Sequence, residues 1–265
     1  METLKVILVV IVLLVIFLLG VLYFLQEKLI FYPDKLNADH NYDFYQEFDE
    51  LMIKTSDGKS LNGLLFKADN SKGLIFYLHG NAGSLESWGT VAELYTHMNY
   101  DLFILDYRGY GKSEGKITGE KQLYEDNQVV YNKIKEIYHE QDIILLGYSI
   151  GTGMAAKLAA DNNPKMLILQ APFYSFEKMM SNQFHFPSFI LKYKFRTNKF
   201  LEQCECPVII FHGNNDEIVN YKWSVKLEEE FKEKIQLITL HGEGHNGITD
   251  NVDYRDELEN VLVER

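Results

Sequence analysis

The sequence predicts an α/β fold in which helices cover both faces of a mostly parallel sheet. Short, continuous apolar runs alternate along the chain with longer segments that have helical spacing. A strand that is buried on both faces is a continuous apolar run, and such runs alternating with helices indicate parallel pairing. The chain has 265 residues, of which 46% are hydrophobic, which is enough for one large domain of this class.

The predicted elements follow one another from residue 47 onward. The first two strands, at 47–54 and 61–67, flank a turn at Ser56-Asp57-Gly58, which has typical turn residues. Apolar runs predict further strands at 74–78, 102–105, 143–146, 166–169, 208–211 and 235–240. Helical spacing predicts helices at 85–97, 119–138, 151–161, 223–231 and 250–263. Residues 171–205 interrupt this alternation and are interpreted as one insertion.

The N-terminal segment is predicted to be a transmembrane helix. Residues 6–25 contain no charge, and a helix of this length spans about 30 Å, the thickness of a bilayer core. No small-residue cleavage site follows, so we expect an uncleaved single-pass anchor. The amino terminus and Lys5 lie before it and Lys28 and Lys35 after it, a balance of positive charge that leaves the side of the membrane open. The expected domains are an anchor at 1–25, an irregular juxtamembrane segment at 26–46 and a catalytic domain at 47–265.

Charge and composition exclude several classes of protein. The net charge of −12 argues against a nucleic-acid partner, because phosphate binding requires a basic face. Cys204 and Cys206 are the only cysteines, and their spacing predicts free thiols instead of a disulfide. No histidine spacing indicates zinc, so no metal is expected.

Ser149 is the candidate nucleophile. It lies in Gly147-Tyr148-Ser149-Ile150-Gly151, between a predicted strand and a predicted helix. A nucleophile elbow needs this strand–turn–helix setting, with glycines that let the strand and helix approach closely. The alternative is a Gly-rich helix start that Ser149 caps.

The candidate acid and base follow the nucleophile, each in a loop after a strand. Asp216 lies in His212-Gly213-Asn214-Asn215-Asp216, and His245 lies in His241-Gly242-Glu243-Gly244-His245. A serine hydroxyl needs a base to accept its proton, and the order serine, acid, histidine is typical of one hydrolase class. Asp106 also ends a strand, but Arg108 follows it closely, so we interpret Asp106 as a structural ion-pair partner.

The predicted oxyanion hole combines two backbone N–H groups. One belongs to Ile150, the residue after the nucleophile. The other comes from the loop His79-Gly80-Asn81-Ala82-Gly83, with Asn81 as first choice and Ala82 as second. Candidate substrate-binding residues are Tyr148, beside the nucleophile, and Phe173 and Tyr174, at the start of the insertion.

Together these motifs, with Asp106-Tyr107-Arg108-Gly109-Tyr110-Gly111, resemble the alpha/beta-hydrolase superfamily. Within it the chain is similar to small membrane-anchored serine hydrolases of the serine-aminopeptidase-like and palmitoyl-thioesterase-like branch. The resemblance covers roughly residues 47–264 and implies an eight-stranded sheet, a short cap at the insertion and hydrolysis without a cofactor. Fold alone does not fix the substrate.

The insertion points to the substrate class. Residues 172–199 carry five basic side chains against Glu177 as the only acidic one, and they are rich in aromatics. Such a surface suits a lipid interface or an acyl chain, whereas the alternative is an amphipathic cap helix that packs its aromatics inward. The aromatics are Phe173, Tyr174, Phe176, Phe184, Phe186, Phe189, Tyr193 and Phe195.

The leading functional hypothesis is therefore a serine hydrolase that cleaves carboxylic esters or thioesters of lipid-like or acylated substrates at the membrane. The first alternative is a serine peptidase of the aminopeptidase type, which would need an acidic residue for the substrate ammonium group. The second, from another class, is a non-catalytic anchored binding protein built on a hydrolase scaffold.

Overall fold

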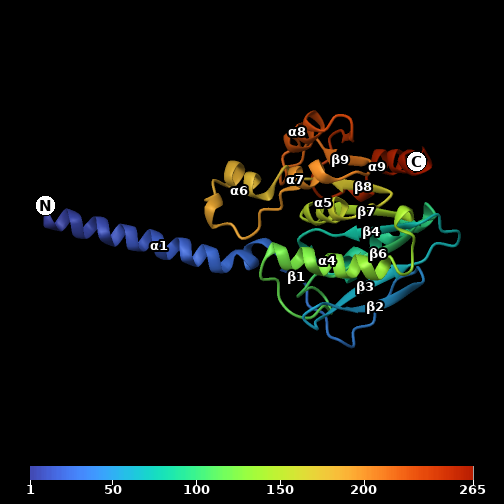
Figure 1. The fold of residues 1–265 in the computed structure, drawn as a ribbon, viewed down its shortest axis with the longest axis horizontal. Helices are drawn as coiled ribbons and strands as arrows, with labels where there is room; N and C mark the ends of the chain where they lie inside the picture. Colours follow the sequence, from blue (N-terminus) through green and yellow to red (C-terminus); the bar gives the residue numbers. More distant parts are fainter. Residues whose placement is uncertain (265) are drawn as a thin grey trace.

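A computed structural model describes residues 1–264, without the side chains of Gln183, Phe184 and Glu264. Phe184, one of the aromatics noted in the insertion, thus lies outside the described side chains. The chain forms a long N-terminal helix, α1 (Glu2–Ile30), that projects from a domain containing all other elements (Figure 1).

The domain is built on an eight-stranded sheet in the order β10-β9-β8-β7-β4-β6-β3-β2. β2 pairs antiparallel with β3 and β3 antiparallel with β6, while every other neighbouring pair is parallel. The prediction of a mostly parallel sheet is confirmed. The strands are β2 (Phe48–Lys54), β3 (Ser60–Phe66), β4 (Leu74–Leu78), β6 (Asp101–Leu105), β7 (Ile143–Tyr148), β8 (Met166–Gln170), β9 (Val208–Gly213) and β10 (Ile235–Leu240).

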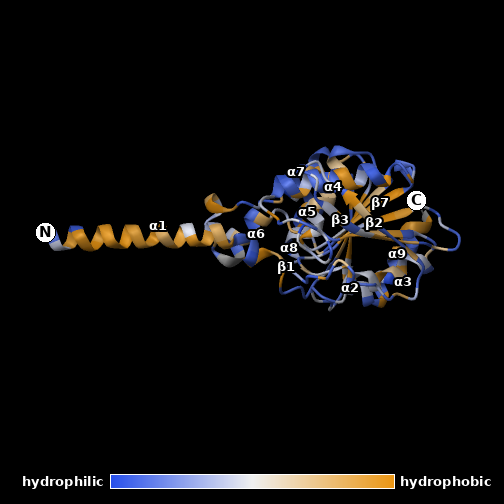
Figure 2. Ribbon diagram, turned by 90° about the horizontal axis from the view of Figure 1, so that it is seen from below, coloured by the Kyte–Doolittle hydropathy of each residue, from blue (hydrophilic) through white to orange (hydrophobic). Residues whose placement is uncertain are grey.

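Two hydrophobic cores lie on the two faces of this sheet. Figure 2 shows α4 (Glu120–Ile134), α5 (Gly151–Asp161) and α7 (Thr197–Gln203) on one face. It shows α2 (Leu85–Trp88), α3 (Ala92–His97) and α9 (Val252–Glu264) on the other. The central strands β4, β6, β7 and β8 are buried throughout, which explains why they are continuous apolar runs in the sequence.

One predicted helix is interrupted. The segment expected as a helix at 85–97 forms α2, a 3₁₀ turn at Gly89–Val91, and α3. Glycine and the β-branched residues of this turn are weak helix formers, and Gly89 packs against the ring of Phe44. In contrast, α8 (Lys222–Glu230) lies close to its predicted position at 223–231.

The insertion is only partly a cap. α6 (Phe176–Phe184) and a 3₁₀ turn at Ser188–Ile190 lie beside the base of α1 (Figure 1). In contrast, α7 packs on α5 and belongs to the main helical layer. Most described aromatics of the insertion point inward, since Phe173, Phe176, Tyr193 and Phe195 are buried, whereas Phe189 is 78% exposed. The inward-packing alternative therefore describes most of this segment.

The juxtamembrane segment is more ordered than expected. α1 continues past residue 25 to Ile30, and β1 (Tyr32–Pro33) then pairs in parallel with β5 (Ala82–Gly83). These contacts tie the end of the apolar helix directly to the loop that follows β4. The expected boundary at residue 25 therefore divides a continuous helix.

Candidate active site

Ser149 occupies a sharp turn between β7 and α5. Its backbone φ is 52°, in the left-handed region that is unfavourable for residues with a side chain. The turn is packed so closely that a Cβ at Gly147 would lie 2.6 Å from the Gly151 carbonyl oxygen. A Cβ at Gly151 would overlap the carbonyl oxygen of Leu78 and lie 2.8 Å from that of His79. The sequence pattern Gly-x-Ser-x-Gly thus has a steric cause.

We expect Gly151→Ala to destabilise the protein, because the new methyl group meets backbone atoms that cannot rotate away. Overpacking of this kind typically costs about 1–3 kcal/mol or more, equivalent to a fall in Tm of at least about 3 °C for a domain of this size. Thermal unfolding of the full-length protein in detergent would measure it. Gly119→Ala is the matched control, since a Cβ there has no neighbour within 4 Å. Equal Tm values for the two variants would contradict this account.

The three residues proposed as a triad are in contact. His245 Nε2 lies 3.0 Å from Ser149 Oγ, and His245 Nδ1 lies 2.7 Å from Asp216 Oδ2. Ser149 follows β7, Asp216 follows β9 and His245 follows β10. Because these strands are parallel members of one sheet, their carboxyl ends lie at the same edge and bring the three loops together.

Asp216 is held as a charged acceptor. Its Oδ1 accepts hydrogen bonds from the N–H groups of Ile218 (2.8 Å) and Val219 (2.7 Å), and its Oδ2 lies 3.1 Å from His212 Nε2. Burial alone would raise the pKa of Asp216, but the hydrogen bonds from His212 and His245 outweigh it and lower this pKa well below its usual value. His212 Nδ1 in turn lies 2.6 Å from Ser224 Oγ, so His212 braces the loop that carries the acid.

The loop after β4 faces the nucleophile. Asn81, Ala82 and Ile150 line the same cavity as Ser149 and His245. Ile150 lies at the start of α5, where the first N–H groups of a helix have no acceptor within the helix. Asn81 is fixed by its carbonyl oxygen, which accepts from Tyr32 N–H at 2.8 Å and from the Tyr110 hydroxyl at 2.6 Å. Both candidate loop residues therefore border the cavity that contains Ser149.

This cavity has a volume of about 710 Å³ and a mainly apolar lining. Phe173, one of the candidate substrate-binding residues, is among its lining residues. Sequence reasoning missed most of its other walls, because they come from segments distant in the sequence and carry no motif. These additional walls are Leu22, Gln26, Leu29, Ile30, Phe176, Met179, Met180, Phe186, Leu191, Ile218, Val219 and Asn246.

Two predicted substrate-binding residues do not line this apolar cavity. Tyr174 does not line the cavity, because its hydroxyl donates to Glu230 at 2.8 Å and its ring lies under the ammonium group of Lys226. Tyr148 packs against the rings of Trp88 and His245, and its hydroxyl donates to the backbone oxygen of His245. Tyr148 therefore supports the histidine loop, and it borders the second cavity, described next, instead of the apolar one.

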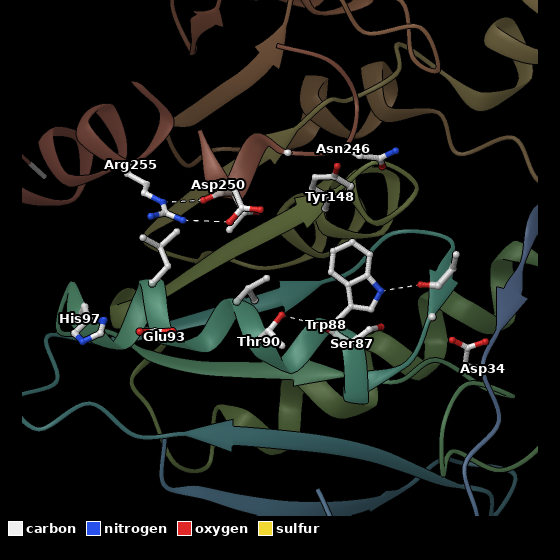
Figure 3. Close-up of a pocket in the computed structure, with 16 residues that line it drawn as sticks. Asp34, Ser87, Trp88, Thr90, Glu93, His97, Tyr148, Asn246, Asp250 and Arg255 are labelled. Carbon is white, nitrogen blue, oxygen red and sulfur yellow. Dashed lines mark hydrogen bonds and ion pairs between the residues drawn. The ribbon is translucent and has the colours of Figure 1, made fainter. Parts of the chain in front are cut away.

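A second, more polar cavity of about 820 Å³ adjoins the first (Figure 3). Ala82 and Asn246 line both cavities, so the two meet beside the Ser149–His245 pair. Trp88 and Tyr148 line the second cavity near this junction, and Arg255, paired with Asp250 at 3.2 Å, lines it farther out. An apolar and a polar space thus flank the nucleophile.

Asp106 does not contact the proposed triad. It is fully buried, accepts a hydrogen bond from Leu85 N–H at 3.1 Å and lies 3.7 Å from His79 Nε2. Burial raises the pKa of Asp106. The expected ion pair with Arg108 is wrong, because the Arg108 guanidinium binds Asp126 and Asp57 instead. Asp106 and Arg108 are close in the sequence, but their side chains bind different partners.

Comparison with known proteins identifies the family. A family model described as serine aminopeptidase, S33, matches residues 69–203, more than half of the 265-residue chain. The chain belongs to this family. The predicted resemblance to the serine-aminopeptidase-like branch is confirmed, and the chain is a hydrolase with the α/β-hydrolase fold. The match includes Ser149 but ends before Asp216 and His245, so the proposal for these two residues rests on the geometry described above.

Two proteins of similar sequence align with more of this chain than the family model does. Human alpha/beta hydrolase domain-containing protein 17B is 29% identical over 207 residues, covering 74% of this chain and 69% of that protein. The protein aho-3 of Caenorhabditis elegans is 28% identical over 199 residues, and the alignment covers 73% of this chain and 58% of aho-3.

Solved structures share the fold. The esterase Pf2001 of Pyrococcus furiosus superposes with a TM-score of 0.71 at 19% identity, covering 89% of this chain and 97% of that one. Est1E of Butyrivibrio proteoclasticus, bound to ferulic acid, gives a TM-score of 0.66 at 23% identity, covering 81% and 98%. These similarities confirm the predicted fold class.

Proposed function

We propose that this protein is a membrane-anchored serine hydrolase that cleaves carboxylic ester or thioester bonds of acylated, lipid-like substrates. The observation that carries the proposal is the chain of contacts from Ser149 Oγ through His245 to Asp216, which opens onto an apolar cavity. The family and the esterases of similar fold support hydrolysis, and the cavity supports an acyl substrate.

The proposed reaction proceeds through an acyl-enzyme. His245 Nε2 accepts the proton of Ser149 as Oγ attacks the carbonyl carbon, and the resulting imidazolium is stabilised by Asp216. Backbone N–H groups of Ile150 and Asn81, or Ala82 in its place, bind the developing oxyanion, each contributing about 3–4 kcal/mol. The imidazolium then protonates the leaving alcohol or thiol. Water, deprotonated by His245, attacks the acyl-enzyme, and Ser149 regains its proton as the carboxylic acid leaves.

The two cavities suit the two halves of such a substrate. The apolar one, which contains Ser149, is assigned to the acyl chain, and the polar one is assigned to the leaving group. Among the described residues, no aspartate or glutamate lines the apolar cavity, which disfavours the aminopeptidase alternative because a substrate ammonium group would be unpaired there.

We further propose that α1 is the membrane anchor. It is long and apolar enough to cross a bilayer, and its apolar residues are largely exposed in the structure. A signal sequence passes the same test of length and composition, but the C-terminal end of this helix is packed into the domain. That packing favours a retained helix over a cleaved one.

We expect the full-length protein in detergent to react with a fluorophosphonate probe. It should also hydrolyse p-nitrophenyl esters and acyl thioesters at least about 100-fold faster than aminoacyl amides, because the apolar cavity would leave an ammonium group without a partner. Gel fluorescence and a matched substrate panel would measure both. Preference for aminoacyl amides would instead support the peptidase, and absence of both labelling and turnover would support a non-catalytic binding protein.

A further inference from the structure

One wall of the apolar cavity is formed by the helix that we propose as the anchor. Leu22, Gln26, Leu29 and Ile30 line the cavity together with Ser149. Their spacing of four, seven and eight residues places them on one face of α1. From this we infer that the C-terminal turns of α1 are part of the acyl-binding site, so that an acyl chain passes between the bilayer and Ser149 along this helix. The inference rests on the proposed hydrolase function.

The end of α1 is fixed to the insertion by polar contacts. Gln26 is only 1% exposed, and its side-chain amide donates to the Ile190 carbonyl at 2.8 Å and accepts from Lys192 N–H at 2.9 Å. A buried amide is stable only with such partners. Glu27 adds an ion pair with Lys192 Nζ at 3.0 Å and accepts from the Tyr193 hydroxyl at 2.9 Å. The helix end is therefore a fixed wall.

The same helix end is tied to the candidate oxyanion loop. The Ile30 carbonyl accepts a hydrogen bond from the Asn81 side chain at 3.1 Å, and Tyr32 pairs with Ala82 in the short parallel sheet. A displacement of α1 would thus be transmitted to the residues that we propose to bind the oxyanion. An element with no role beyond tethering would not need contacts on both sides of the cavity.

The position of this wall matches the edge of a bilayer. As a helix, the uncharged run at residues 6–25 spans about 30 Å, the thickness of a bilayer core. Leu22 lies in the last turn of this run, and therefore near the edge of the bilayer core. Figures 1 and 2 show α1 leaving the domain beside α6, whose Phe176, Met179 and Met180 line the cavity. Apolar side chains are exposed at the same end, with Phe189 at 78% and Leu29 and Ile218 at 51% each. Exposed apolar groups beside a membrane helix favour contact with lipid.

The test compares chain-length selectivity in variants of α1. Full-length protein in nanodiscs would be assayed with p-nitrophenyl butyrate and p-nitrophenyl palmitate, and the palmitate-to-butyrate ratio of kcat/KM recorded. Each additional methylene in the cavity should raise kcat/KM about fourfold until the space is filled. Leu22→Trp fills the space beside the proposed chain path and should lower the ratio at least about tenfold. The matched control is Leu25→Trp, because Leu25 is 40% exposed and is not among the described residues that line the cavity.

The outcomes separate this inference from the proposed function. A ratio lowered by Leu22→Trp but not by Leu25→Trp supports the inference. If Leu22→Trp fails to fold, Leu22→Ala should still lower the ratio about threefold, because it removes apolar contact with the chain. Equal ratios in all variants, or no palmitate turnover by the wild type beside normal butyrate turnover, would overturn the inference alone. If the wild type hydrolysed neither ester, the proposed function would be overturned as well.

Discussion

Replacing Ser149 with alanine should lower ester turnover by about four to six orders of magnitude, since nucleophile, base and acid act as a unit. The physical reason is the 3.0 Å contact between Ser149 Oγ and His245 Nε2, through which the attacking oxygen loses its proton. Alanine removes that oxygen and adds no atoms to a closely packed turn, so the fold should persist. Steady-state turnover and fluorophosphonate labelling of the full-length protein would measure the loss.

The control for this variant is Ser56→Ala, which changes an exposed serine in the turn between β2 and β3. It should retain wild-type turnover and labelling. Both variants should have similar thermal midpoints, so that a loss of activity in Ser149→Ala is not a loss of folding. Undiminished labelling of Ser149→Ala would show that another residue is the nucleophile.

Much of the fold follows from local patterns. The strands β4, β7 and β8 are buried on both faces, so their apolar runs predict them closely. Ser149 is also predictable, because close packing requires glycine at 147 and 151 whatever the rest of the sequence. Asp216 and His245 follow strand ends, and parallel strands bring such ends together. Each of these features is encoded within a few residues.

The walls of the apolar cavity are not encoded in this way. Leu22 belongs to a run that is predicted from hydrophobicity alone, and the contacts of Gln26, just after this run, with the insertion join segments about 165 residues apart. The sequence offers one signal that the end of this helix contacts the rest of the protein. This signal is Gln26, an uncharged polar residue at the end of the apolar run, followed at once by Glu27 and Lys28. Side-chain direction was the other unpredictable quantity, since Phe173 lines the cavity and its neighbour Tyr174 turns to Glu230.

A second large effect is expected for Asp216→Asn, with turnover reduced by about 10⁴. Two backbone N–H groups, those of Ile218 and Val219, bind Asp216 Oδ1 and would hold the oxygen of an asparagine in the same place. The new NH₂ group would then face His245 Nδ1 and His212 Nε2, where the carboxylate now accepts. His245 would have to accept at Nδ1 and carry its proton on Nε2. In that tautomer it cannot take the proton of Ser149.

The measurement is kcat/KM on a short ester, with thermal unfolding of the same preparation to show that the fold persists. Asp106→Asn is the comparison, because Asp106 is also buried, follows β6 of the same sheet and contacts His79 and Leu85 but none of the three proposed triad residues. It should reduce turnover by less than about tenfold, since it leaves the His245 tautomer unchanged. Fluorophosphonate labelling should slow in Asp216→Asn in parallel with turnover, because both need deprotonation of Ser149. A larger loss in Asp106→Asn at unchanged stability would mean that the other carboxylate supports the base.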